Sequence, residues 1–424
     1  MTRSDFRVHL GLCVLVFLGL GGLPSRGAER GTGVPASGAA GAGLGAPATN
    51  NEVRALWVQR TTLTSAPAIV SLVETAKAAG FNTLLVQVRG RGDAYYNSRF
   101  EPRGAALARQ DRSFDPLELA IAAAHHAGLR VHAWVNVNLI ADADLPAADT
   151  HVVYQHPEWL MVPRELAADL SGMDRRSPEY VARLARYARA HNEAIEGLYL
   201  SPIPSAAADY TVSVISDIAE RYAVDGIHLD YIRFPSDEFD YSAGALGEFR
   251  AAVLRRASAA ERREYDRRGD GRPLSYTQMF PQRWQEFRRE KVTALVARLR
   301  SVVKERRRDA VLSAAVWPDA AEAASRRFQD WRGWLDAKLV DVVCPMAYTP
   351  DAALFRSQIA AVRQVSGRQA VWAGIGAYRL SPADTVARID TARRLGAQGI
   401  ILFSYDNLIP GNYLATVGRN AFKD

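Results

Sequence analysis

Short runs rich in β-branched and aromatic residues alternate with longer amphipathic runs along almost the whole chain from residue 51 onward. The first pattern predicts strands and the second predicts helices, because each matches the side-chain period of its element. Eight strands are expected, at residues 53–58, 83–88, 130–137, 226–231, 311–317, 340–348, 370–377 and 399–405. Strands separated by helices form a parallel sheet, and eight such strands close a (β/α)8 barrel of the α/β class, a TIM barrel.

The expected helices lie between these strands, at residues 68–79, 116–127, 210–222, 284–305, 354–365 and 382–395. Gly80, Gly128 and Gly396 follow three of them, where a helix commonly ends in a left-handed residue. An open, doubly wound sheet is the alternative fold. No glycine-rich phosphate-binding loop follows the first expected strand to favour it.

Two connections are too long for simple crossovers: residues 138–209 after the third expected strand and 232–283 after the fourth. Both leave the C-terminal ends of strands, which is the end where such barrels place their active sites. Long connections at that end usually build a substrate cleft.

Polar residues gather on the faces of the strands that we expect to point into the barrel. Side chains on a strand alternate between two faces, so His132, Trp134 and Asn136 share one face of the third strand. The second and fourth strands place further polar residues inward: Gln87, Arg89, His228 and Asp230. Buried polar groups are costly unless they pair or line a wet cleft. We therefore expect a ligand pocket, with a self-paired polar cluster as the alternative.

Asp230 ends the fourth expected strand and is the residue that we expect at the centre of the active site. A carboxylate there can act as acid, base or nucleophile at a sugar carbon. Glycoside hydrolysis normally uses a second carboxylate, about 5–5.5 Å away for retention or about 6.5–9.5 Å for inversion. Asp93 and Asp319 are the predicted second catalytic residues, although each can equally be a helix cap or loop residue.

Aromatic and polar residues at the strand ends are suited to sugar binding, because flat rings stack on the apolar face of a pyranose. The predicted substrate-binding residues are Arg89, His132, Trp134, Asn136, His228, Tyr231, Trp317, Tyr348 and Tyr405.

No histidine pair has a recognised metal-binding spacing such as H-E-x-x-H, so we expect neither a metal nor a cofactor. A metal site formed by His132, His228 and Asp230 is the alternative. The net charge is +7 and the basic residues are nearly all arginine, which we attribute to coding composition, with a dedicated polyanion-binding surface as the alternative. No basic run with interleaved aromatic residues indicates a nucleic-acid partner.

The N-terminal region predicts export. Arg3 and Arg7 precede an apolar run over residues 8–23, which small residues follow, and this pattern predicts a secretory signal peptide over residues 1–27. An uncleaved membrane anchor is the alternative. Residues 28–50 are rich in Gly, Ala and Pro and are expected to form a linker before the barrel of residues 51–424. We expect a periplasmic or extracellular protein, in contact with a membrane only if the N-terminal segment stays uncleaved.

The order of motifs resembles that of glycosyl hydrolase-like family 10, a family of bacterial envelope barrels. The matching segments are 52–57, 81–94, 124–136, 156–159, 199–202, 225–235, 284–292, 341–348 and 403–405. This resemblance implies a (β/α)8 barrel that hydrolyses glycosidic bonds, with peptidoglycan strands stripped of their stem peptides as one substrate. It also implies that a 2-acetamido sugar can supply its own nucleophile.

Two positions depart from related patterns. The segment 225–230 also resembles the fourth-strand signature of chitinases, but Ile232 stands where that signature carries its acidic Glu. Met346 stands where the resembled family has Gln. The chitinase mechanism therefore does not carry over.

The sequence predicts an exported glycoside hydrolase that acts on an envelope or extracellular polysaccharide. A non-catalytic carbohydrate-binding barrel and a metal-assisted polysaccharide deacetylase are the alternatives.

Overall fold

The computed structural model describes residues 52–422. The expected signal peptide or anchor (1–27) and the expected linker (28–50) lie outside the described residues. Within residues 52–422, none of the helices is both long enough and apolar enough to cross a membrane.

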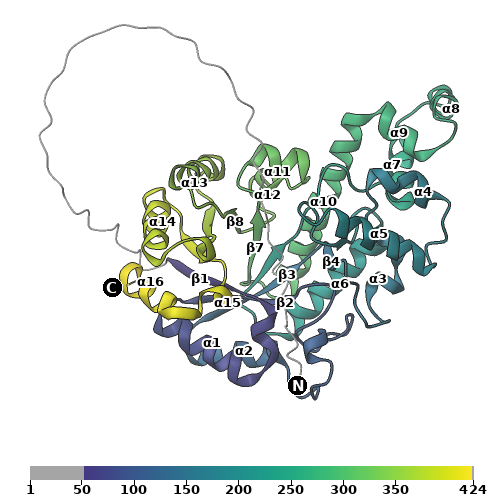
Figure 1. Ribbon diagram of the computed structural model, residues 1–424. Coiled ribbons are helices and arrows are strands. Elements are labelled where there is room, and N and C mark those ends of the chain that lie inside the picture. The colour runs from purple at the N-terminus through teal and green to yellow at the C-terminus, as the bar shows by residue number, and fades with distance from the viewer. Residues whose placement is uncertain (1–51, 423–424) are drawn as a thin grey trace, which may run out of the picture.

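Eight parallel strands form a closed barrel, which confirms the predicted fold (Figure 1). The first strand pairs with both the last and the second, so the ring closes. The barrel strands are β1 (Val53–Val58), β2 (Thr83–Arg89), β3 (Arg130–Asn136), β6 (Gly226–Asp230), β7 (Val311–Val316), β8 (Val342–Ala347), β9 (Ala370–Ile375) and β10 (Gly399–Leu402). Several end earlier than predicted, because the chain turns there into the loops of the barrel mouth, the end where the C-termini of the strands lie.

Helices follow the strands and surround the barrel (Figure 1). They are α1 (Ala66–Ala78), α2 (Pro116–His126), α6 (Ser205–Arg221), α10 (Pro281–Arg306), α11 (Ala320–Arg326), α12 (Trp331–Asp336), α13 (Ala352–Ser366), α14 (Pro382–Arg394), α15 (Tyr405–Leu408) and α16 (Tyr413–Ala421). Gly80, Gly128 and Gly396 have φ of 79°, 74° and 81°, so the predicted left-handed helix ends are confirmed.

Two apolar clusters, one on each face of the strands, make up the core. Val131, Ala133 and Val135 of β3 belong to the outer cluster beneath the helices. The inner cluster fills the barrel and includes Trp57, Leu85, Trp134, Cys344, Trp372 and Ile401. This division confirms the predicted inward and outward faces of β3. Burial of each large apolar side chain stabilises the fold by roughly 1.5–3 kcal/mol.

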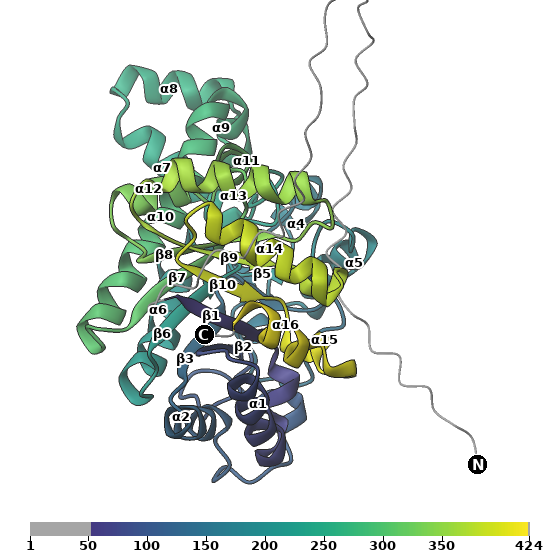
Figure 2. The same cartoon turned by 90° about the vertical axis from the view of Figure 1, so that its left-hand side faces the viewer.

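The two long connections both begin at the barrel mouth. The connection after β3 contains an antiparallel pair, β4 (Leu139–Ala141) and β5 (Leu198–Tyr199), and helices α3 (Val152–Gln155), α4 (Ala167–Ser171) and α5 (Pro178–Ala190). The connection after β6 contains α7 (Ala243–Arg255), α8 (Ala259–Arg268) and α9 (Pro273–Met279). These three helices stand away from the barrel as an arm (Figure 2).

Gly226 opens β6 directly opposite His132 in the strand register. A Cβ atom at Gly226 would lie 2.5 Å from His132 Nδ1 and 2.7 Å from the Val311 carbonyl oxygen. We predict that Gly226→Ala lowers the free energy of unfolding by about 1–3 kcal/mol, because overpacking in a closed barrel cannot relax. Urea unfolding measures this.

Gly247 is the matched control, because a Cβ atom there would meet nothing within 4 Å. Its position inside α7 means that Gly247→Ala should stabilise the protein by about 0.5–1 kcal/mol. Equal stability of the Gly226→Ala variant and the parent protein would contradict the packing described for β6.

Candidate active site

Asp230 is the last residue of β6, and its carboxyl group lies at the barrel mouth, held by three donors. Its Oδ1 accepts hydrogen bonds from the Tyr231 backbone amide (2.7 Å) and from Arg233 Nη1 (3.3 Å). Its Oδ2 accepts one from Trp134 Nε1 (3.2 Å). The residue is only 6% exposed, so both the position and the orientation of the carboxyl group are fixed.

Burial raises the pKa of Asp230 above its ordinary value, because water no longer stabilises the charged form. The attraction of Arg233 and the hydrogen bonds from Tyr231 and Trp134 act in the opposite direction without cancelling this effect. A dry carboxyl group with a raised pKa can hold a proton and deliver it to a leaving group, which is the property of a general acid.

The turn after β6 brings Arg233 back onto Asp230. Tyr231 has φ of 50°, in the left-handed region that a bulky residue rarely adopts. This conformation aims the Tyr231 amide at the carboxylate, and Arg233 then lies over the Tyr231 ring, with its guanidinium carbon 4.2 Å from the centroid. Backbone strain of this kind, of order 1–3 kcal/mol, is typical of functional sites.

Aromatic rings lie at the mouth, and one of them, Phe403, has its centroid 6.3 Å from that of Trp134, the indole that holds Asp230. Phe403 lies at their centre, with ring centroids 5.3 Å from Tyr348, 5.9 Å from Tyr378 and 6.0 Å from Trp57. Tyr348, Tyr378 and Phe403 are half-buried, so each presents part of its ring to the mouth. Such rings can stack on the apolar face of a sugar.

His228 and His132 lie deeper in the barrel and are part of its core. His228 Nε2 accepts from Trp57 Nε1 (3.1 Å), so its Nδ1 carries the proton and donates to Ser313 Oγ (2.9 Å). Burial lowers the pKa of His228 to about 3 and that of His132 to about 4, so both rings are neutral at pH 7. Both rings are almost completely buried, so their contact with substrate stays a prediction that this geometry does not favour.

The alternative metal site is not assembled. His132 pairs in register with Gly226, at the opposite end of β6 from Asp230. Within the described residues, no group of three or more His, Cys, Asp or Glu side chains has the arrangement needed to hold a metal ion.

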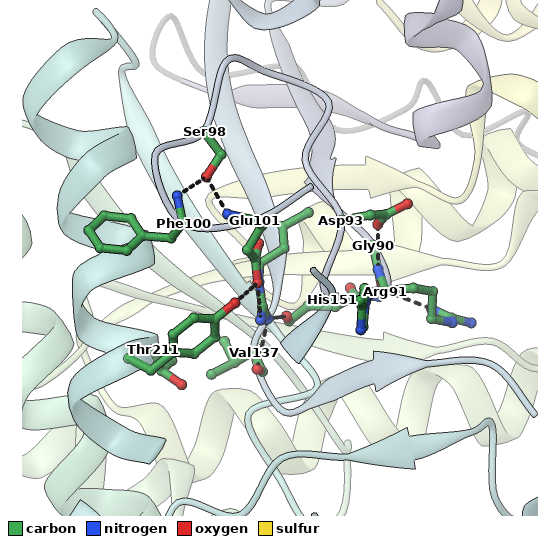
Figure 3. A network of polar contacts seen from close by, with 12 residues as sticks. Gly90, Arg91, Asp93, Ser98, Phe100, Glu101, Val137, His151 and Thr211 are labelled. Atoms are coloured by element: carbon green, nitrogen blue, oxygen red, sulfur yellow. Dashed lines mark hydrogen bonds and ion pairs between the residues drawn. The ribbon is translucent and has the colours of Figure 1, made fainter. Parts of the chain in front are cut away.

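Arg89, a predicted substrate-binding residue, forms half of a buried ion pair. Its guanidinium is fully buried and lies 2.7 Å from Glu101, which also accepts a hydrogen bond from Tyr210. Arg89 Nη1 donates to the backbone carbonyls of Asn136 and Val137. This network, drawn around Glu101 and Val137 in Figure 3, fastens the loop after β2 to the end of β3.

Asn136 and Trp134 also serve as supports. The Asn136 amide is fully buried and donates to the Gly90 carbonyl (2.8 Å). Trp134 is 3% exposed and uses its only polar atom to hold Asp230. Both were predicted to bind substrate; in the structure their side chains hold Gly90 and Asp230 in place.

The two other aspartates predicted to be catalytic have local structural roles. Asp319 is exposed and caps α11 by accepting from the Glu322 amide (2.8 Å). Asp93 accepts from the Arg91 amide (2.8 Å) within the loop after β2, as Figure 3 shows. The structure shows no contact of either carboxylate with Asp230 among the described residues.

Tyr405 lies away from the mouth, in contrast to its prediction. The chain leaves β10 after Leu402, so Tyr405 starts α15 and is buried in the outer cluster, where its hydroxyl interacts with Ser71 and Thr75 of α1. Tyr231, Tyr348 and Trp317 remain half-buried at or near the mouth. These three, with Asp230, are the predicted site residues that the structure brings together.

Five residues of the mouth were not among the predicted site residues: Glu196, Arg233, Arg327, Tyr378 and Phe403. Phe403 lies inside the expected strand 399–405, two residues before Tyr405 on the same face, and could have been found from that alternation. Glu196 comes from the long connection after β3, where no strand alternation guides a prediction; it accepts a hydrogen bond from the Tyr199 hydroxyl.

A closed eight-stranded barrel with a buried carboxyl group and aromatic rings at the C-terminal mouth is the architecture of many carbohydrate-active enzymes. Residues 49–381 match the model of the family described as Glycosyl hydrolase-like 10. The chain belongs to this family, which confirms the resemblance seen in its motifs.

Two relatives carry glycosyl hydrolase names. Glycosyl hydrolase YngK of Bacillus subtilis (strain 168) is 23% identical over 205 residues, which are 44% of this chain and 34% of YngK. Glycosyl hydrolase DigH of Escherichia coli (strain K12) is 20% identical over 311 residues, which are 67% of this chain and 58% of DigH. The chain therefore spans less than two thirds of either relative.

Solved structures share the fold. The glycoside hydrolase domain of PgaB (BpsB) from Bordetella bronchiseptica has a TM-score of 0.60 at 16% identity and covers 88% of this chain and 100% of that domain. The catalytic domain of β-amylase from Paenibacillus polymyxa has a TM-score of 0.56 at 11% identity, with coverage of 88% and 98%. At these identities the likeness shows the fold alone.

We predict that Glu101→Gln lowers the free energy of unfolding by about 3–5 kcal/mol, because the variant leaves the Arg89 charge buried without its partner. Replacing both residues, as Arg89→Met with Glu101→Leu, should recover much of this loss. Urea unfolding of the single and double variants measures both effects. A loss below about 1 kcal/mol in the single variant would show that the pair is solvated.

Proposed function

We propose that the protein is an exported glycoside hydrolase that cleaves glycosidic bonds in an envelope or extracellular polysaccharide, with Asp230 as its general acid. The observation that carries this proposal is the buried Asp230 carboxyl group, which is held by three donors beside half-buried aromatic rings. Membership of a glycosyl hydrolase-like family supports the same reaction class.

The proposed reaction begins with a sugar seated against the aromatic rings of the mouth. Asp230 then gives its proton to the oxygen of the glycosidic bond, and that bond breaks as the leaving group becomes a neutral alcohol. Arg233 and Trp134 stabilise the carboxylate that remains. A water molecule later adds its hydroxyl group to the sugar, and the remaining proton goes to Asp230.

Neither Asp93 nor Asp319 contacts Asp230 among the described residues, so we do not assign the nucleophile to either of them. Some glycosidases use a 2-acetamido group of the substrate itself as the nucleophile. Peptidoglycan strands carry this group, so strands without stem peptides are the first substrate that we propose. Export of the protein, predicted from residues 1–27, would bring it to that polymer.

We predict that Asp230→Asn lowers kcat/KM on these strands by about 10²–10⁴-fold, because the variant has no proton to donate. The purified chain would be incubated with the strands and the products read by mass spectrometry. Asp351→Asn is the matched control, since Asp351 is an exposed aspartate that caps α13 and asparagine caps equally well.

Different outcomes of this experiment separate the alternatives. Cuts that persist in Asp230→Asn would overturn the assignment of the acid. Strands that bind without being cut, equally in both proteins, would make the barrel a carbohydrate-binding module. Activity that a chelator removes and zinc restores would require metal-assisted chemistry.

A second prediction concerns pH. An acid works only while protonated, so kcat/KM should fall as the pH rises through the pKa of Asp230. Trp134→Phe removes a donor that stabilises the charged form, and it should move this alkaline limb to higher pH. Trp372→Phe, a control within the same inner cluster, should leave the limb in place. A shift to lower pH in Trp134→Phe would contradict the role of the indole.

A further inference from the structure

Arg327 is a cation at the barrel mouth, near Arg233. It follows α11, and its backbone carbonyl accepts from the Phe234 amide (3.0 Å), which ties it to the segment after β6. Among residues 52–422, no carboxylate lies within ion-pairing distance of its guanidinium, and its side chain makes no hydrogen bond to the protein. The residue is half-buried, so the group remains reachable from solvent.

The surroundings of Arg327 are unfavourable to an unbound cation. Burial lowers its pKa, and the neighbouring Arg233 lowers it further by repulsion. Glu196 and Tyr199 act in the opposite direction without cancelling these effects. A protein gains nothing in stability by crowding two guanidinium groups at the same place.

The ring beneath Arg327 holds its guanidinium in place. Its central carbon lies 5.0 Å from the centroid of the Trp317 ring, at the end of β7, the strand next to Asp230. A guanidinium resting on an indole face can direct its N–H groups outward, and their fork geometry matches a carboxylate in a bidentate manner.

We propose that Arg327 binds a carboxylate carried by the substrate sugar, so that the polymer cleaved at Asp230 is an acidic polysaccharide. This inference rests on the proposed function. The anion would lie on the Trp317 side of the mouth, with Arg233 adding long-range attraction while it remains paired with Asp230. Ligand binding would then relieve the repulsion between the two guanidinium groups.

The experiment compares a carboxylated glycan with the same glycan after carbodiimide activation and borohydride reduction, which turn each carboxylate into a primary alcohol. One arm uses a polyuronate, whose carboxylate is attached to the sugar ring. The other arm uses amino-sugar strands with an ether-linked lactyl carboxylate. The full chain is tested as the parent protein and as Arg327→Gln, Arg327→Lys and Arg326→Gln.

Arg326 is the matched control, because it is the adjacent arginine, is 64% exposed and faces Asp237 at 3.9 Å. Whichever of the two carboxylated glycans is the substrate, we expect Arg327→Gln to lower kcat/KM on it by about 10- to 100-fold. This is the usual effect of losing one charged hydrogen bond. The reduced glycan should be cut equally by the parent protein and Arg327→Gln. On the carboxylated glycan, kcat/KM of Arg327→Lys should lie between the values of the parent protein and Arg327→Gln. The value of Arg326→Gln should equal that of the parent protein.

Equal loss on both forms of the glycan would overturn the inference, since it would show that Arg327 only supports the fold. So would a parent protein that cuts both forms at the same rate. If no glycan is cut, the proposed hydrolase function fails, and calorimetric binding of the carboxylated oligosaccharides then decides about Arg327 separately. Binding lost in Arg327→Gln but kept in Arg326→Gln supports the inference, and equal or absent binding contradicts it.

Discussion

The candidate active site depends on a single carboxyl group, that of Asp230, which is kept almost out of water at the end of a barrel strand. An isolated carboxylate cannot be buried without partners, so Asp230 is surrounded by an amide, an indole and a guanidinium. These donors compensate for desolvation only in part, and the result is a raised pKa. Fixed orientation and a raised pKa are two properties that a general acid needs, and Asp230 has both at the barrel mouth.

The remainder of the barrel keeps that group in place. Beneath it, Trp57, His228 and Ser313 form a hydrogen-bonded row across the interior, which leaves the polar atoms of this layer satisfied. Beside it, the Arg89–Glu101 pair holds the loop after β2 against the end of β3. Some polar residues inside the barrel thus pair with one another below the mouth and others reach its surface, while His132 Nδ1 is buried with no hydrogen-bond partner among the described residues.

Much of the fold follows from sequence alone, because strand alternation and helix ends are local properties. The face of β3 that carries Trp134, the left-handed glycines and the place of Asp230 are all predictable in this way. The roles of the individual inward residues cannot be predicted in this way, because sequence does not reveal which buried polar groups pair with one another. Arg89 pairs with Glu101, which lies in a loop. Tyr405 packs in the outer cluster because β10 ends at Leu402. Glu196 and Arg327 reach the mouth from connections whose path depends on tertiary packing.

Titration of Asp230 itself tests the central claim most directly. Infrared difference spectra between the parent protein and Asp230→Asn, recorded across a pH series, isolate the signal of this one carboxyl group. The predicted result is a carboxylic acid signal that persists above the ordinary pKa of aspartate, which is about 3.9. A group that is already ionised at or below that pH would show an ordinary buried salt bridge, and the proposed acid role would have no physical basis.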